Sequence, residues 1–288
     1  VLNMMKNYQE TRWHPILLFG YEKNERILIA LLNAILGLKG TEKIKSLTFI
    51  NSINLKEYLK DKTTTLDVKA EDTEGKRYNI EMQIKGYKYY INRVIYYQDK
   101  LFTSQLQEGE DYQTLNKTIS ISILNYEFLK EEKEIHNIYR FKNTESNNEL
   151  TDIKEIHFIE LPKFDKEKPE GLRTKFEKWL FILKFGENYI DSIDNLPDNL
   201  KNEEEIIMAL REMIRASSDD VVRELLEYRD KALHDEATRL FEAREEGMAE
   251  GMEKGREEGK IEAARKLLKE GMKRTDIARI LELKEEDF

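Results

Sequence analysis

The stretch TLDVKAEDTEGKRYNIEMQIKG, residues Thr65 to Gly86, alternates apolar and polar residues, breaks at a glycine-centred turn, and then alternates again. Alternation with a period of two is typical of a strand that is buried on one side. The intervening EDTEGK, with Gly75, has the composition of a hairpin turn. The stretch therefore predicts two antiparallel strands joined as a β-hairpin.

The same period predicts a cluster of polar side chains. If the apolar sides of both strands face the core, Asp67, Glu81 and Gln83 come out on one common face. Two carboxylates on a rigid sheet repel each other and favour a hard divalent cation such as Mg²⁺. Such a cation can activate water and offset charge on a phosphodiester. The alternative interpretation is the solvated face of an amphipathic hairpin, where charges are ordinary.

Strand and helix patterns interleave in the first half of the chain. Apolar residues at helical spacing predict helices over 24–37, 89–107, 174–184 and 203–228, with another beginning near Lys231, and strand patterns cover 43–53, 117–124 and 155–161. In the first helix the apolar residues are Ile27, Leu28, Leu31, Leu32, Ile35 and Leu36, and Gly37 would end it. Interleaved elements followed by helices alone indicate an α/β core with a helical C-terminal part.

Five segments in this order resemble a known family. They are LFGYEKNERILIALLNAILGL, LDVKAEDTEGKRYNIEMQ, RVIYYQDKLFTSQLQEGEDY, EIHFIELPKF and a glycine-spaced tail. Together they resemble the bacterial recombination-promoting nuclease/transposase family of the PD-(D/E)XK nuclease superfamily. Asp67, followed after the turn by Glu81-Met82-Gln83, is similar to its D…(E/D)-x-K signature. The resemblance implies a restriction-endonuclease-like α/β core, a mixed central sheet flanked by helices, with a helical C-terminal extension.

The resemblance also implies an activity and its residues. It points to a Mg²⁺-dependent DNA endonuclease, with Mn²⁺ as a substitute metal, in which Asp67 and Glu81 are the metal ligands. Gln83 stands where the superfamily usually has Lys. Because an amide carries no positive charge, Lys85, or Lys69 on the paired strand, would stabilise the transition state. The N-terminal TRWHPILLFG lacks the Asp and Phe-Lys expected just before LFG.

Two further acids are candidates for an auxiliary role. The superfamily often supplies an acidic residue from its first helix, and Glu22 and Glu25 stand at the start of the helix that ends before Gly37. The alternative is that each is a carboxylate placed favourably near a helix N-terminus.

The segment after Gln83, IKGYKYYINRVIYYQ, mixes cations with tyrosines. Cations can contact phosphates and aromatic rings can stack on bases. We expect Lys88 and Arg93 to contact DNA, because they would lie beside the predicted metal site. The alternative is a helix whose tyrosines face the core while its charges stay in water.

The composition indicates where in the cell the protein works and excludes several kinds of chemistry. The 288 residues carry a net charge of −9, so the whole-molecule field would repel DNA and binding would have to be local. Cysteine is absent, which excludes disulfides, thiolate zinc sites and cysteine nucleophiles. No apolar run approaches the roughly 20 residues of a membrane span, so we expect a cytoplasmic protein. The four histidines lack ligand spacing, and we expect His157 to be a packing residue in its strand.

The C-terminal part carries a regular stripe of small residues. Glycines recur at 247, 251, 255 and 259 within a charged helical pattern. Because each costs about 0.5–1 kcal/mol against Ala in a helix, we expect close helix approach and a homo-oligomer; a flexible charged linker is the alternative. After Gly271 as C-cap and Thr275 as N-cap, DIARILEL forms a last helix. The predicted domains are 1–240, nuclease-like, and 241–288, a glycine-striped helix with a helix-turn-helix-like element.

Two function classes remain open from the sequence. The first is a Mg²⁺-dependent DNA endonuclease whose breaks promote recombination or horizontal gene transfer. The second is a catalytically degenerate, oligomerising DNA-binding or regulatory protein, whose carboxylates hold no metal. A transposase of the DDE type is a weaker third possibility, because it needs three acidic residues and only two can be placed.

Overall fold

A computed structural model describes residues 16–19, 22–50, 65–83, 86, 88–189, 193–218 and 220–288. At several of these positions, Glu22 and Asp67 among them, the description covers the backbone alone. Two compact units divide the chain, one up to Leu226 and one from Glu227 to Phe288. The first unit carries the sheet, and the described second unit is helical.

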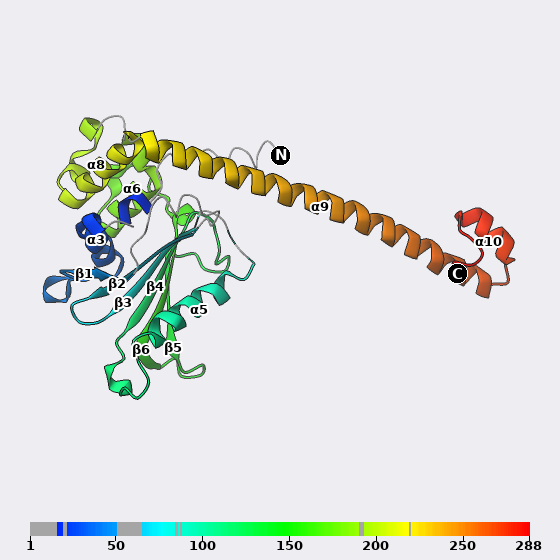
Figure 1. Ribbon diagram of the computed structural model, residues 1–288, viewed down its shortest axis with the longest axis horizontal. Helices are drawn as coiled ribbons and strands as arrows, with labels where there is room; N and C mark the ends of the chain where they lie inside the picture. Colours follow the sequence, from blue (N-terminus) through cyan, green and yellow to red (C-terminus); the bar gives the residue numbers. More distant parts are fainter. Residues whose placement is uncertain are drawn as a thin grey trace. The chain divides into compact units, whose positions relative to one another are not determined.

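The first unit is built on a six-stranded sheet with the order β1-β2-β3-β4-β6-β5 (Figure 1). The strands are β1 (Leu47–Phe49), β2 (Thr65–Asp72), β3 (Arg77–Gln83), β4 (Thr118–Leu124), β5 (His136–Lys142) and β6 (Glu149–Glu160). The pairs β3–β4 and β4–β6 are parallel, and the other three are antiparallel. The prediction of a mixed central sheet in an α/β fold is confirmed.

The β2–β3 hairpin closes through the turn that the sequence predicts. The backbone N–H of Asp72 donates to the carbonyl of Lys76 at 3.0 Å, and Asp72 Oδ1 accepts the backbone N–H of Glu74 at 2.9 Å. Gly75 has a φ of +80°, and a Cβ there would lie 2.5 Å from the side chain of Asn116. The backbone angle therefore favours glycine at this turn, and a Cβ would also displace the side chain of Asn116.

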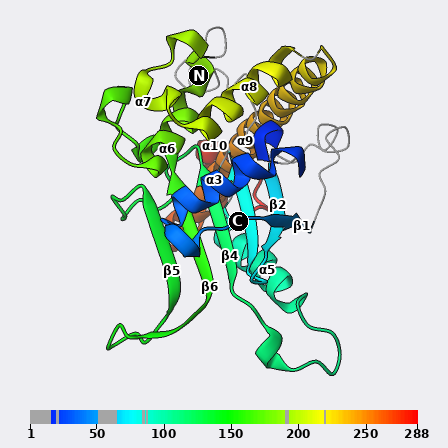
Figure 2. The same ribbon diagram turned by 90° about the vertical axis from the view of Figure 1, so that its left-hand side faces the viewer.

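The main core lies between one face of the sheet and a helical layer. The helices of this layer are α2 (Ile16–Phe19), α3 (Glu25–Ile35), α6 (Lys175–Phe185), α7 (Asp198–Lys201) and α8 (Glu204–Ser218), with the 3₁₀ turn η1 (Glu22–Asn24) before α3. In Figure 2, α3 crosses in front of the strands. Of its predicted apolar residues, Leu36 is the half-buried C-cap, and the others are buried: Ile27, Leu28, Leu31, Leu32 and Ile35. Gly37 follows the helix with a φ of +67°, as a C-terminal glycine should.

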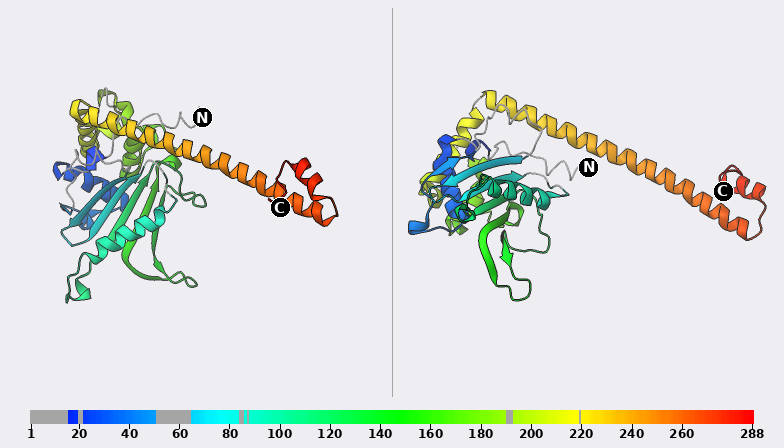
Figure 3. Two further views of the ribbon diagram at one scale, coloured as in Figure 1. Left: turned by 45° about the vertical axis from the view of Figure 1, so that its right-hand side comes forward. Right: turned by 60° about the horizontal axis from the view of Figure 1, so that its bottom comes forward.

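Helix α5 (Tyr90–Thr103) lies along the opposite face of the sheet (Figure 3). Its inner side is formed by the buried residues Tyr90, Val94, Gln98 and Leu101. Gln98 Nε2 donates to the carbonyl of Glu155 at 2.7 Å, which fastens α5 to β6. Ile91 and Ile95, two apolar residues within the predicted helix over 89–107, do not lie on this inner side. They are 47% and 43% exposed.

The β5–β6 hairpin was only partly predicted. Strand β5 was not expected, and β6 begins at Glu149, six residues before the predicted strand. His157 is more than a packing residue. It is 2% exposed, and its Nδ1 lies 2.9 Å from Nε2 of His136 in β5.

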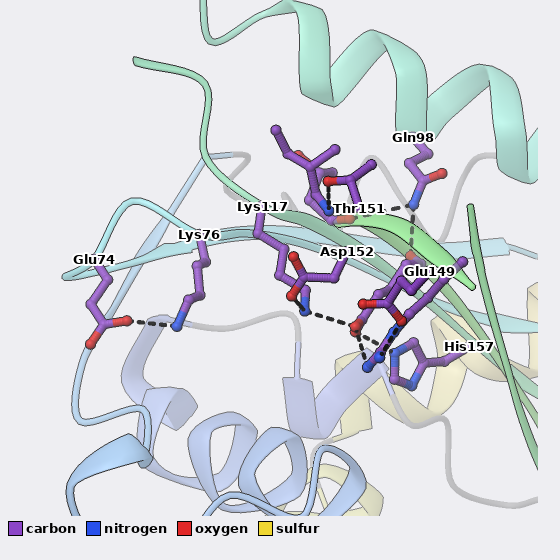
Figure 4. A network of polar contacts seen from close by, with 12 residues as sticks. Glu74, Lys76, Gln98, Lys117, Glu149, Thr151, Asp152 and His157 are labelled. Atoms are coloured by element: carbon purple, nitrogen blue, oxygen red, sulfur yellow. Dashed lines mark hydrogen bonds and ion pairs between the residues drawn. The ribbon is translucent and has the colours of Figure 1, made fainter. Parts of the chain in front are cut away.

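Glu155 is the centre of a polar network on the same hairpin, and Figure 4 labels its partners Lys117 and His157. Its carboxylate lies 3.1 Å from Nε2 of His157, 2.7 Å from Nζ of Lys117 and 2.5 Å from Nη2 of Arg140. Burial opposes ionisation of Glu155, but the hydrogen bonds with His157 and Lys117 outweigh it and lower its pKa to about 2. The network therefore holds a charged carboxylate between β5, β6 and Lys117, the residue before β4.

Acid should weaken this hairpin through His136. Burial, and next the charge of His157, lower the pKa of His136 to about 4 from 6.5. The neutral folded form then contributes stability above pH 6.5, and this is lost as the pH falls from 6.5 towards 4, by on the order of 2–3 kcal/mol. Urea unfolding of wild type and His136→Gln at several pH values measures this loss of stability. The variant should lose less stability over this window; equal losses would contradict the assignment.

The C-terminal helices differ in detail from the prediction. After α8, the 50-residue helix α9 runs from Asp220 to Lys269 without a break near Lys231, and α10 covers Arg274–Leu281. Gly271 has a φ of +89°, as expected of a C-terminal glycine. The N-cap of α10 is Lys273, so Thr275 was wrongly predicted as the cap.

The four glycines of the stripe lie inside α9, and a Cβ on any of them would meet nothing within 4 Å. Self-association through this segment and a domain boundary at residue 240 stay predictions. Among the described residues, no helix has the length and apolar character to cross a membrane.

Candidate active site

Asp67 and Glu81 are direct partners in the antiparallel ladder of β2 and β3. Residues opposite each other in such a ladder share one face of the sheet, with Cβ atoms about 5 Å apart. Gln83 lies two residues beyond Glu81 on the same strand, and both are 1% exposed. On its other side, Glu81 pairs with Ser122 of β4. The register therefore places these three residues together, on the face of the sheet that α5 covers.

The Glu81 carboxylate lies among polar groups of β3 and α5. Its Oε2 accepts a long hydrogen bond of 3.5 Å from the hydroxyl of Tyr90, and its Oε1 lies 3.5 Å from Nδ2 of Asn79. Arg93 Nε is 3.9 Å from Oε2. Burial, and next the negative charge of Glu81, raise the pKa of the Tyr90 phenol far above its ordinary value. Tyr90 therefore stays protonated and remains a hydrogen-bond donor to the carboxylate.

Glu25 is engaged at another place in the fold. Its Oε1 accepts the backbone N–H of Leu47 at 2.7 Å and the hydroxyl of Ser46 at 3.0 Å. Leu47 pairs with Asp72, at the far end of β2 from Asp67. Five residues of antiparallel strand span about 17 Å, so Glu25 fastens the start of β1 instead of joining the Asp67–Glu81 pair.

Two other predicted residues are described incompletely or not at all. Glu22 belongs to η1, and its side chain is outside the description. Lys85 lies outside the described residues.

Lys88 and Arg93 flank the start of α5. Lys88 is exposed, with Nζ 5.4 Å from the ring centre of Tyr89. Arg93 is half-buried, and its guanidinium carbon lies 4.8 Å from the ring centre of Tyr97. Arg93 thus lies beside Glu81 as expected, and DNA contact by either residue stays a prediction.

Comparison with protein families gives this arrangement a context. A family model described as PD-(D/E)XK nuclease family transposase matches residues 16–243. The chain belongs to this family. The match covers the β2–β3 hairpin, α5 and the layer of α3, α6 and α8. No curated protein and no solved structure matched the chain.

The donor set of this PD-(D/E)XK family member suits a divalent metal. Glu81 offers carboxylate oxygens and Gln83 an amide oxygen, and Asp67 is opposite Glu81 in the ladder. Oxygen ligands of this kind fit Mg²⁺ or Mn²⁺ and not soft metals. The described side chains contain no group of three or more His, Asp or Glu that could hold a metal, but Asp67 lies outside that set. The residues present therefore fit a hard cation shared by two carboxylates.

The sequence did not single out Asn79, Ser120 and Tyr90 as neighbours of the site. Asn79 and Ser120 are direct partners across β3 and β4 and are each 1% exposed, and the buried atoms Asn79 Oδ1 and Ser120 Oγ form no hydrogen bond within the described residues. Alternation would have found Asn79, which shares a face with Glu81. Nothing in the local pattern distinguishes Tyr90 from the tyrosines around it.

Proposed function

We propose that this family member is a metal-dependent DNA endonuclease that hydrolyses phosphodiester bonds, with Asp67 and Glu81 as the ligands of a Mg²⁺ ion. The observation that carries the proposal is the register, which sets Asp67 opposite the buried Glu81. A buried carboxylate is costly unless it is compensated, and a structural role alone would not call for a second carboxylate across the ladder.

Different residues of the chain would have different roles in the reaction. When bound, a divalent cation offsets negative charge on the phosphodiester and makes water a better nucleophile. Tyr90 and Asn79 hold the Glu81 carboxylate in place. Gln83, with an amide that both donates and accepts hydrogen bonds, would orient the attacking water. Lys85 and Arg93 would supply the positive charge that Gln83 lacks.

The proposed role in DNA recombination or horizontal transfer is supported by the family to which the chain belongs. Its members include transposases by description, and breaks in DNA are the starting point for recombination and horizontal transfer. DNA is the expected substrate, although the net charge of −9 opposes it at long range. Local cations on α5 would therefore have to hold the substrate.

Incubation of the purified protein with supercoiled plasmid tests the proposal. Nicked or linear plasmid should form with Mg²⁺ or Mn²⁺ and should not form with EDTA. A folded protein that cleaves no form of DNA with any of these metals would contradict the proposal. It would favour the DNA-binding alternative, in which Glu81 pairs with Arg93 and holds no metal.

A further inference from the structure

The outer side of α5 carries a row of aromatic residues. Tyr89, Arg93, Tyr96 and Tyr97 follow the spacing i, i+4, i+7, i+8, which places them on one side of a helix. Tyr89 and Tyr96 are 67% and 61% exposed. We call these four residues the tyrosine row. Rings of this size exposed on a protein surface are typical of contact with another molecule.

Cations lie between and beside the rings. Arg93 lies over Tyr97, and Lys69 Nζ of β2 is 5.6 Å from the centre of that same ring. Lys88 stands next to Tyr89. The acid of α5, Asp99, is 2.5 Å from Lys154 of β6. The row therefore combines exposed rings with cations on a chain of net negative charge, which suits a polyanion.

Arg93 links the row to the proposed active site. It belongs to the row and also lies 3.9 Å from the Glu81 carboxylate. Tyr90, the neighbour of Tyr89, points to the inner side and donates to the same carboxylate. A polymer that contacts Arg93 on the row would thus be one side chain away from the buried Glu81.

Exposed rings that alternate with cations match the chemistry of a single strand of nucleic acid. Unpaired bases stack on tyrosines while phosphates contact Lys and Arg, whereas the bases of an intact duplex are already stacked and unavailable to rings. We propose that the tyrosine row binds single-stranded DNA, so that unpaired DNA is the preferred substrate of the site. This inference rests on the proposed nuclease function.

Two other exposed residues of α5 provide a control for the tyrosine row. Ile91 and Ile95 are also exposed, but they lie on the other side of α5 from the tyrosine row. They resemble the row in apolar character and lack its cations. Their loss should not affect DNA binding if stacking on the row is the cause.

Binding and cleavage of one labelled sequence, as a single strand and as a duplex, test the inference. Fluorescence anisotropy in the presence of Ca²⁺ gives the affinity for each DNA. The same DNA incubated with Mg²⁺ gives the cleavage rate. Wild type should prefer the single strand. The double variant Tyr89→Ala/Tyr96→Ala should bind the single strand about tenfold or more weakly, since stacking contributes about 1–3 kcal/mol per base. Duplex affinity should change less. Tyr89→Phe/Tyr96→Phe should restore binding, and Ile91→Ala/Ile95→Ala should behave as wild type.

The outcomes separate this inference from the proposed function. A wild type that cleaves the duplex in Mg²⁺ but not the single strand, or an alanine variant with unchanged affinity, overturns the inference and leaves the nuclease intact. Loss of self-association in the alanine variant, with DNA binding unchanged, would make the row a contact between copies and also overturn it. Cleavage by Asp67→Asn at the wild-type rate would refute the proposed function itself.

Discussion

The variant Glu81→Gln should cleave plasmid DNA in Mg²⁺ about a thousandfold more slowly than wild type. The amide has nearly the shape of the carboxylate, so the buried position stays filled. The change removes the negative charge that would hold the cation, and loss of a single electrostatic group at a catalytic centre costs about 10²–10³ in rate. The initial rate of plasmid nicking measures the effect.

Glu71→Gln is the matched control for this variant. Glu71 lies on β2, four residues from Asp67 and therefore on the same face, and pairs with Arg77 by an ion pair of 2.7 Å. This pair is partly exposed, and an ion pair near the surface contributes about 0–1 kcal/mol. Glu71→Gln should keep the wild-type rate. If Glu81→Gln is folded and cleaves within a few-fold of wild type, Glu81 is not a metal ligand.

Glu155→Ala should lower the free energy of unfolding by about 3 kcal/mol or more, because it breaks a buried charge cluster from one side. The change would leave Lys117, Arg140 and His157 without the carboxylate that they share. Because the cluster joins β5, β6 and Lys117, the residue before β4, the whole hairpin edge should loosen. Urea unfolding of wild type and variant gives this loss of free energy from the shift of the midpoint, provided that the dependence on urea concentration (the m-value) is unchanged.

Glu149→Ala provides the comparison for Glu155→Ala. Glu149 also pairs with Arg140, at 3.0 Å, but its side chain is 39% exposed. Loss of an exposed pair of this kind should lower the free energy of unfolding by less than about 1 kcal/mol. Equal effects of the two variants would mean that burial of Glu155 is not what makes the network stabilising.

Much of this architecture could be predicted because its signals are local. The period of two in β2 and β3 and the glycine turn are contained in one short stretch, and so is the common face of Asp67 and Glu81. The apolar spacing of α3 likewise predicts which of its residues are buried. In each case the physical constraint acts between residues that are near neighbours in the sequence.

The rest depends on partners that are far apart in the chain. Strand β5 is mostly exposed, and what holds it is pairing with β6 and the contact of His136 with His157, 21 residues away. On the inner side of α5, Gln98 donates to a carbonyl 57 residues away. Neither partner can be identified from a local pattern.

Thermal unfolding with and without Mg²⁺ tests the central claim, that Asp67 and Glu81 form a metal centre, without any assumption about the DNA substrate. A ligand that binds only the folded state stabilises it, by about 2.7 kcal/mol at a hundredfold excess over Kd. The midpoint of wild type and of Glu71→Gln should therefore rise with Mg²⁺ or Mn²⁺, and that of Asp67→Asn should not. An equal rise in wild type and Asp67→Asn, or no rise in a folded wild type, would contradict the account.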